Sequence, residues 1–198
     1  MSDITISTVK TKKELKAFVR FNYELYKDCP YAVPDLLEDT LDTFNPQKNP
    51  AFNFCEAEFF LAKRNGKIVG RVAAIINNRA NETWKKQTVR FGWIDFIDDI
   101  EVSRLLLDAV EKWGAERGMN KIVGPMGFTD LDLEGMLTEG FDQLSTMNSI
   151  YNYPYYPTHM ERMGFEKDAD WVEFRITIPE AVPEKHQRIA DIVRRKHN

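Results

Sequence analysis

The stretch that decides the fold is EAEFFLAKRNGKIVGRVAAIIN, residues 56–77. It consists of two apolar runs, 56–64 and 67–77, which meet at Asn65-Gly66. Asn-Gly suits the two-residue turn of a tight hairpin, because both positions of that turn need a positive φ. The stretch therefore predicts two long antiparallel strands.

Upstream of this hairpin, the sequence predicts one strand and two helices. Residues 4–9 alternate in polarity as a short strand does. Thr11 and Glu14 have the spacing of a capping box, so a helix is expected to begin there and to end before Cys29-Pro30. Pro34 suits the first turn of a second helix.

Downstream of the hairpin, strands and helices are expected to alternate. A polar loop at 77–86 leads into a strand, and Asp98 or Asp99 then begins an amphipathic helix that ends at Gly118. The later elements expected are a strand at 122–123, irregular chain over 128–153, a helix at 157–163, a strand at 171–178 and a basic helix after Pro183.

The composition is that of a folded protein, with 198 residues, 43% of them hydrophobic and 29% charged. We divide the chain into one domain, 1–178, and a basic connector or C-terminal helix, 179–198. The net charge of −4 argues against a nucleic-acid partner, because phosphate contacts need a basic face. The local exception is the basic group at the end of the chain: Lys185, Arg188, Arg194, Arg195 and Lys196.

The sequence also favours a cytoplasmic protein. Cys29 and Cys55 stand apart from any motif, which indicates reduced thiols, although one disulfide is left open. The first residues lack the basic and apolar regions of a signal peptide. No apolar run approaches the roughly 20 residues that span a bilayer, so we expect no membrane partner.

Three segments carry a resemblance to a known superfamily. They are the hairpin Phe59 to Arg71, the helix end Glu111 to Gly118 and the segment His159 to Glu166. Together they resemble the GNAT-like acyl-CoA N-acyltransferases over roughly Phe59 to Ile178. This resemblance implies an α/β (α+β) fold with a mixed, mostly antiparallel central sheet and helices on both of its faces.

A narrower resemblance concerns the arrangement of domains. Gly124-Pro125-Met126, Gly140-Phe141-Asp142 and residues 151–156 resemble the N-terminal half of a bacterial two-domain branch of the superfamily. Chains of that branch are about twice as long, and their second half looks like the better acyltransferase. The resemblance therefore implies a second GNAT-like domain as a partner. In an isolated domain, the apolar residues of the helix after Pro183 could instead pack against a second copy of the chain, forming a homodimer.

The resemblance also implies a cofactor, acetyl-CoA or another acyl-CoA, held where the fourth strand meets its helix. The stretch in question holds Ile97, Asp98, Asp99, Ser103 and Arg104. The family pattern is Arg or Gln, two residues, Gly, one residue, then Gly or Ala, but no glycine occurs here. Asp98 with Glu101 instead fits a capping box. An acidic helix cap and a divergent phosphate loop are both open interpretations.

The expected catalytic groups are Tyr155, Tyr156, Asp132 and Glu134. Many GNAT enzymes have a tyrosine four residues before the Gly-Phe pair that protonates the departing thiolate, and Met160 stands there in this chain. The two tyrosines could replace it, or could belong to an aromatic packing patch. The two carboxylates, with Asp130, could deprotonate an amine, or could be solvated loop residues. We expect no metal site and no Ser/His/Asp arrangement, and we place His159 on a helix surface.

Two functions follow from these features. The first is an N-acyltransferase that moves an acyl group from CoA to a small-molecule amine. The second is a non-catalytic GNAT-like module that packs against, or regulates, a catalytic partner domain.

Overall fold

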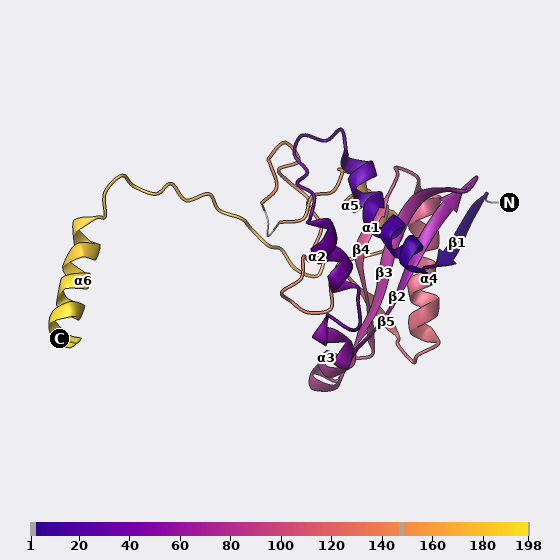
Figure 1. Cartoon of the computed structure of the whole chain (residues 1–198), viewed down its shortest axis with the longest axis horizontal. Coiled ribbons are helices and arrows are strands. Elements are labelled where there is room, and N and C mark those ends of the chain that lie inside the picture. The colour runs from indigo at the N-terminus through magenta and orange to yellow at the C-terminus, as the bar shows by residue number, and fades with distance from the viewer. Residues whose placement is uncertain (1–2, 147–148, 198) are drawn as a thin grey trace. The chain divides into compact units, whose positions relative to one another are not determined.

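The computed structural model describes residues 3–146 and 149–197 and divides the chain into two compact units, Met1–Glu166 and Lys167–Asn198. Figure 1 shows the elements. In the first unit they are β1 (Ile4–Thr8), α1 (Lys12–Tyr26), α2 (Leu37–Thr43), the 3-10 helix η1 (Pro50–Asn53), β2 (Cys55–Arg64), β3 (Lys67–Asn77), α3 (Asn78–Trp84), β4 (Thr88–Phe96), α4 (Ile100–Ala115), β5 (Lys121–Val123) and α5 (Tyr155–Arg162). The second unit contains α6 (Glu184–His197).

Within the described residues, one sheet holds five strands in the order β1-β2-β3-β4-β5. The pairings β1 with β2, β2 with β3 and β3 with β4 are antiparallel, whereas β5 runs parallel to β4. Asn65 and Gly66 both have positive φ, 50° and 77°, so the predicted hairpin turn is confirmed. The capping box of α1 is confirmed too, because the Glu14 amide donates to Thr11 Oγ1 at 3.2 Å and Thr11 N–H donates to Glu14 Oε2 at 2.9 Å.

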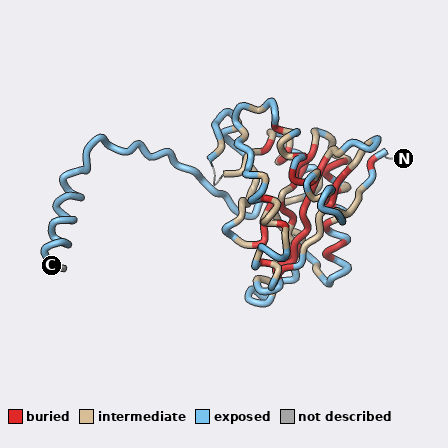
Figure 2. The backbone as a smooth tube through the Cα atoms, viewed as in Figure 1, coloured by how far each residue is buried: buried red, intermediate tan, exposed pale blue. Residues whose placement is uncertain are grey.

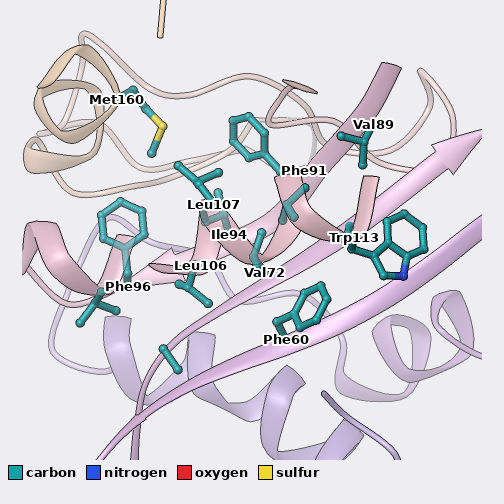
Figure 3. Close-up of a cluster of buried hydrophobic side chains, with 14 of the residues drawn as sticks. Phe60, Val72, Val89, Phe91, Ile94, Phe96, Leu106, Leu107, Trp113 and Met160 are labelled. Atoms are coloured by element: carbon teal, nitrogen blue, oxygen red, sulfur yellow. The ribbon is translucent and has the colours of Figure 1, made fainter. Parts of the chain in front are cut away.

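Helices cover both faces of this sheet, as expected. Successive strand residues point to opposite faces, so Leu61 packs beneath α1 while Phe60 and Ala62 lie on the α4 face. Figure 2 shows the buried chain concentrated in the strands and in α4. Figure 3 shows the cluster on the α4 face, with labelled residues Phe60, Val72, Val89, Phe91, Ile94, Phe96, Leu106, Leu107, Trp113 and Met160.

The pairing of β4 with β5 is short. It covers only Thr88 to Arg90, opposite Lys121 to Val123. Beyond it, the chain after β5 lies against β4, because Met126 N–H donates to the Phe91 carbonyl at 2.8 Å. The last residues of β4 therefore have a free edge on this side, and that edge is where the candidate site lies.

Several predicted elements differ from the structure. The second helix, expected to begin at Pro34, begins at Leu37. Residues 77–86, expected as a loop, contain the short helix α3, whose first turn is capped by the Asn77 side chain accepting from Ala80 N–H at 2.8 Å. The strand predicted at 171–178 is wrong: the structure places no strand there, and Phe174 and Ile176 are 79% and 82% exposed. Alternation alone does not form a strand, since its backbone groups need a neighbouring strand to pair with.

We predict that Gly92→Ala destabilises the fold. A Cβ at this position of β4 would lie 2.3 Å from the Met126 carbonyl oxygen, and backbone cannot rotate away as a side chain can. Overpacking of this kind costs about 1–3 kcal/mol. Chemical denaturation of the variant and the parent chain measures the difference. Equal free energies of unfolding would show that the chain after β5 does not lie this close to β4.

Candidate active site

The junction of β4 and α4 is closed by Asp99. Its Oδ1 accepts the Glu101 amide at 2.9 Å, and its carbonyl accepts the amides of Val102 and Ser103 at 3.0 and 3.3 Å. The predicted cap at Asp98 is therefore wrong by one residue, because the Asp98 carboxylate is engaged elsewhere. The broader prediction of an acidic helix cap agrees with the structure. An aspartate accepts one of the helix amides that a bound phosphate would need.

Asp99 is also paired with a cation. Its Oδ2 lies 2.6 Å from Arg64 Nη2, and Arg64 further contacts Asp3 at 3.1 Å. The hydrogen bond from Arg64 lowers the pKa of the Asp99 carboxyl, and the Glu101 amide adds to this. The helix start consequently holds an ionised carboxylate, which complements the helix dipole and takes the place that another anion would need.

A buried histidine ties α5 to the start of α4. His159 Nε2 lies 3.0 Å from Asp98 Oδ1, and its Nδ1 lies 2.9 Å from Ser103 Oγ. The imidazole is 4% exposed and Ser103 is completely buried. The structure thus forms the Ser/His/Asp arrangement that the sequence did not suggest, and the placement of His159 on a helix surface is wrong.

This arrangement holds two helices together and cannot attack a substrate. Ser103 Oγ has no exposed surface and also donates to the Ile100 carbonyl at 3.1 Å. The His159 ring stacks on Phe96, with ring centres 5.2 Å apart. The burial of His159 could have been predicted from helical spacing. His159 follows Tyr156 by three residues and Met160 follows Tyr156 by four, so all three lie on one face of the helix.

The remaining residues predicted to hold a cofactor are dispersed. Arg104 lies on the exposed side of α4, where it pairs with Asp108 at 3.0 Å and with Glu101 at 3.7 Å. Ile97 donates its N–H to the Val69 carbonyl at 3.1 Å and packs against the core. The guanidinium of Arg104 and the amide of Ile97 are therefore both engaged within the chain, and they do not converge on one ligand-binding position.

Both candidate tyrosines bind the free end of β4. Phe96 N–H donates to the Tyr156 hydroxyl at 3.2 Å, and the Tyr155 hydroxyl donates to the Phe96 carbonyl at 2.6 Å. The Tyr156 hydroxyl also lies 2.8 Å from that of Tyr26 and 3.2 Å from Asp95 Oδ1. Burial raises the pKa of Tyr156 well above its usual value and raises that of Tyr155 as well. Both phenols are therefore neutral donors whose protons are already used.

The candidate carboxylates lie in the loop after β5. Asp132 Oδ2 accepts the Thr129 amide at 2.9 Å and so holds a turn of this loop. Glu134 has a buried Oε2 without a hydrogen-bond partner in the described chain, and burial, followed by the charge of Asp130, raises the pKa of its carboxyl. Across residues 3–146 and 149–197, no hydrogen bond or ion pair joins either carboxylate to the tyrosines of α5.

Residues 3–146 and 149–197 contain no cluster of three His, Cys, Asp or Glu side chains that could hold a metal ion. None of the helices in this part of the chain is long and apolar enough to cross a membrane.

The fold is that of the GNAT-like acyl-CoA N-acyltransferase superfamily. A predicted acetyltransferase from Clostridium acetobutylicum, solved with acetyl-CoA, superposes with a TM-score of 0.50 over 87% of this chain and 96% of its own. The sequence identity is 14%, so the likeness concerns the fold. No protein-family model matches the chain.

Two curated proteins are similar in sequence. Protein YghO of Escherichia coli K12 is 35% identical over 165 residues, which are 83% of this chain and 42% of that protein. A bacterial ceramide synthase of Caulobacter vibrioides is 30% identical over 188 residues, 94% of this chain and 49% of that protein. The chain thus spans less than half the length of both relatives.

We predict that Asp99, and not Asp98, caps α4. Asp99→Ala should cost about 0.5–2 kcal/mol, and Asp98→Ala less, because Asp98 is exposed and accepts no helix amide. A carboxyl whose pKa is lowered by folding stabilises the fold above its unfolded pKa, about 3.9, and loses that effect as pH falls. The stability gap between the parent chain and Asp99→Asn should therefore shrink below about pH 4. Denaturation at several pH values measures both effects, and a larger loss for Asp98→Ala would place the cap at Asp98.

Proposed function

We propose that this chain is a GNAT-like domain of an N-acyltransferase that does not hold the acyl-CoA itself, and that a second GNAT-like unit does so. The observation that supports this is the occupation of the cofactor position. The start of α4 and the free end of β4, where this fold is expected to receive the cofactor, are bonded to the chain's own side chains.

The first argument is electrostatic. A CoA pyrophosphate needs free amides and a positive helix end. Here Asp98, Asp99 and Glu101 crowd that end, and Arg64 is already committed to two carboxylates. Bringing two further negative charges to this position would require Asp99 to release both the helix and Arg64.

The second argument concerns the reacting atoms. In N-acyl transfer the amine nitrogen attacks the thioester carbonyl, the C–N bond forms, and the C–S bond breaks. The amine loses a proton and the thiolate gains one. Backbone amides along β4 would polarise the thioester carbonyl, but the amide of Phe96 donates to Tyr156 and its carbonyl accepts from Tyr155. The Phe96 amide and both candidate tyrosine hydroxyls are thus already engaged in hydrogen bonds within the chain.

The activity of the whole protein is inferred from its relatives. One of them is called a ceramide synthase, and a ceramide is the N-acyl derivative of a long-chain amine. Both relatives are more than twice as long as the region they share with this chain, so they have room for a second domain of this size. The acceptor class that we propose is therefore an amine, with an acyl-CoA as donor.

We predict that acetyl-CoA stabilises this chain no more than inorganic pyrophosphate does at the same millimolar concentration. A ligand present at 100 times its dissociation constant would add about 2.7 kcal/mol to the free energy of unfolding. Melting temperatures measured with acetyl-CoA, CoA, pyrophosphate and buffer test this. A rise specific to acetyl-CoA and CoA would contradict the proposal and favour catalysis by this domain.

The second unit gives separate support for a packing role. Val172, Phe174, Ile176 and Ile178 alternate in the sequence with polar residues and are 75–87% exposed. Ile189, Ile192 and Val193 lie on one face of α6 and are about half exposed. Apolar surface of this extent is typical of an interaction site, which fits a module that docks on a second GNAT-like unit.

We predict that the chain alone uses this surface to associate with a second copy. Phe174→Ser with Ile176→Ser, or removal of the residues after Pro183, should lower the mass in solution measured by light scattering. Arg175→Gln, a polar residue between the two changed positions in the sequence, is the matched control and should leave the mass unchanged. A parent chain that is monomeric at all concentrations would contradict the prediction.

A further inference from the structure

A hollow with three lysines lies at the end of the sheet where β4 begins. Its volume is about 490 Å³, and its lining residues are Lys85, Lys86, Gln87, Thr88, Asn120 and Lys121. The turn after α3 supplies the first residues and the entry to β5 supplies the last two. Figure 1 shows α3 and β5 at this end of the first unit.

The floor of the hollow is held by hydrogen bonds between the two segments. The Gln87 carbonyl accepts the amides of Asn120 and Lys121 at 2.9 and 3.1 Å, and Asn120 Nδ2 donates to Gln87 Oε1 at 2.9 Å. Thr88 then pairs with Lys121 as the first rung of β4 and β5. These contacts fix the spacing of the lysine backbones before any ligand arrives.

The charges in this hollow are unbalanced. None of its lining residues is acidic, and in the described chain no ion pair involves Lys85, Lys86 or Lys121. The hollow beside it, of about 480 Å³, shares Asn120 and Lys121 but also contains Asp108 and Glu111. Of these two neighbouring hollows, the first therefore has an excess of positive charge, in a chain whose net charge is −4.

A polar side chain and an aromatic side chain near the lysines could also contact a ligand. Thr88 is 8% exposed, and its buried Oγ1 has no hydrogen-bond partner among the described residues. Trp84, the last residue of α3, directly precedes Lys85 and is 70% exposed. Lysine is a compact cation suited to phosphate, and an exposed tryptophan beside it offers a flat apolar surface.

We propose that the Lys85–Lys86–Lys121 hollow binds a phosphate-bearing ligand. The site lies at the opposite end of β4 from the junction with α4, so it is separate from the cofactor position of the fold. A compact anion with more than one negative charge fits it, because three lysines and no acidic residue line it. The phosphate can belong to a soluble molecule or to a lipid head group.

The test uses the whole chain and a matched pair of triple variants. The site variant is Lys85→Gln, Lys86→Gln, Lys121→Gln. The control is Lys12→Gln, Lys13→Gln, Lys16→Gln, which removes the same charge from the exposed side of α1. Binding of inorganic pyrophosphate is measured by calorimetry. Co-sedimentation is measured with phosphatidylcholine vesicles that contain or lack phosphatidylglycerol.

The expected result is binding by the parent chain and the control, and a loss of about tenfold or more in the site variant, because the lysines that attract the anion have been removed. Binding to pyrophosphate alone identifies a soluble source. Binding only to the phosphatidylglycerol vesicles, weakened further by Trp84→Ala, identifies a head group. The proposal is overturned if the parent chain binds neither probe, or if the site and control variants bind equally well.

Discussion

The buried ion pair of Arg71 and Asp95 is the interaction on which the candidate site depends. Arg71 Nε lies 2.7 Å from Asp95 Oδ2, and the two residues are 4% and 5% exposed. Breaking such a pair from one side costs about 3–5 kcal/mol, because it leaves a buried charge without a partner. Arg71 is held further by the carbonyls of Phe18 and Val19 in α1.

The same pair joins β3, which carries Arg71, with α1 and α5 around the end of β4. Asp95 also accepts from Asn22 at 3.1 Å and from Tyr26 at 3.3 Å, both on α1, and from Tyr156 on α5. Tyr156 can satisfy Asp95 only if α5 lies against the free edge of β4. That position brings Tyr155 to the Phe96 carbonyl and His159 to Asp98 and Ser103. The hydrogen bonds that occupy the end of β4 and the start of α4 thus accompany the way in which the core neutralises a buried carboxylate.

The features that the sequence predicted are local or periodic. Asn65-Gly66 determines its turn through backbone conformations that few other residues adopt, and Thr11 with Glu14 determines a helix start through neighbouring amides. The amphipathic pattern of α4 identifies its buried face without reference to other elements. By contrast, α3 has seven residues with little apolar periodicity, and its cap at Asn77 was hidden by the general polarity of that stretch.

The features that the sequence missed join residues far apart in the chain. His159 meets Asp98 across 61 positions and Ser103 across 56, so no spacing could indicate the contact. The error of one residue at the cap has the same origin. Asp98 and Asp99 are equally good cap residues by type, and the choice between them depends on His159 and Arg64, which occupy one carboxylate each.

The distribution of charge along β4 connects the acidic junction with the lysine hollow. The strand has nine residues, and a rise of about 3.3 Å for each places its ends roughly 25–30 Å apart. Charges in solution are screened over about 8 Å at physiological ionic strength, so the carboxylates near Phe96 cannot neutralise the lysines near Thr88. One strand therefore begins in a region that attracts anions and ends in a region that repels them. A phosphate that approaches the first unit therefore meets a lysine-rich hollow at the start of β4, which is the end remote from the two tyrosines and from the acidic start of α4.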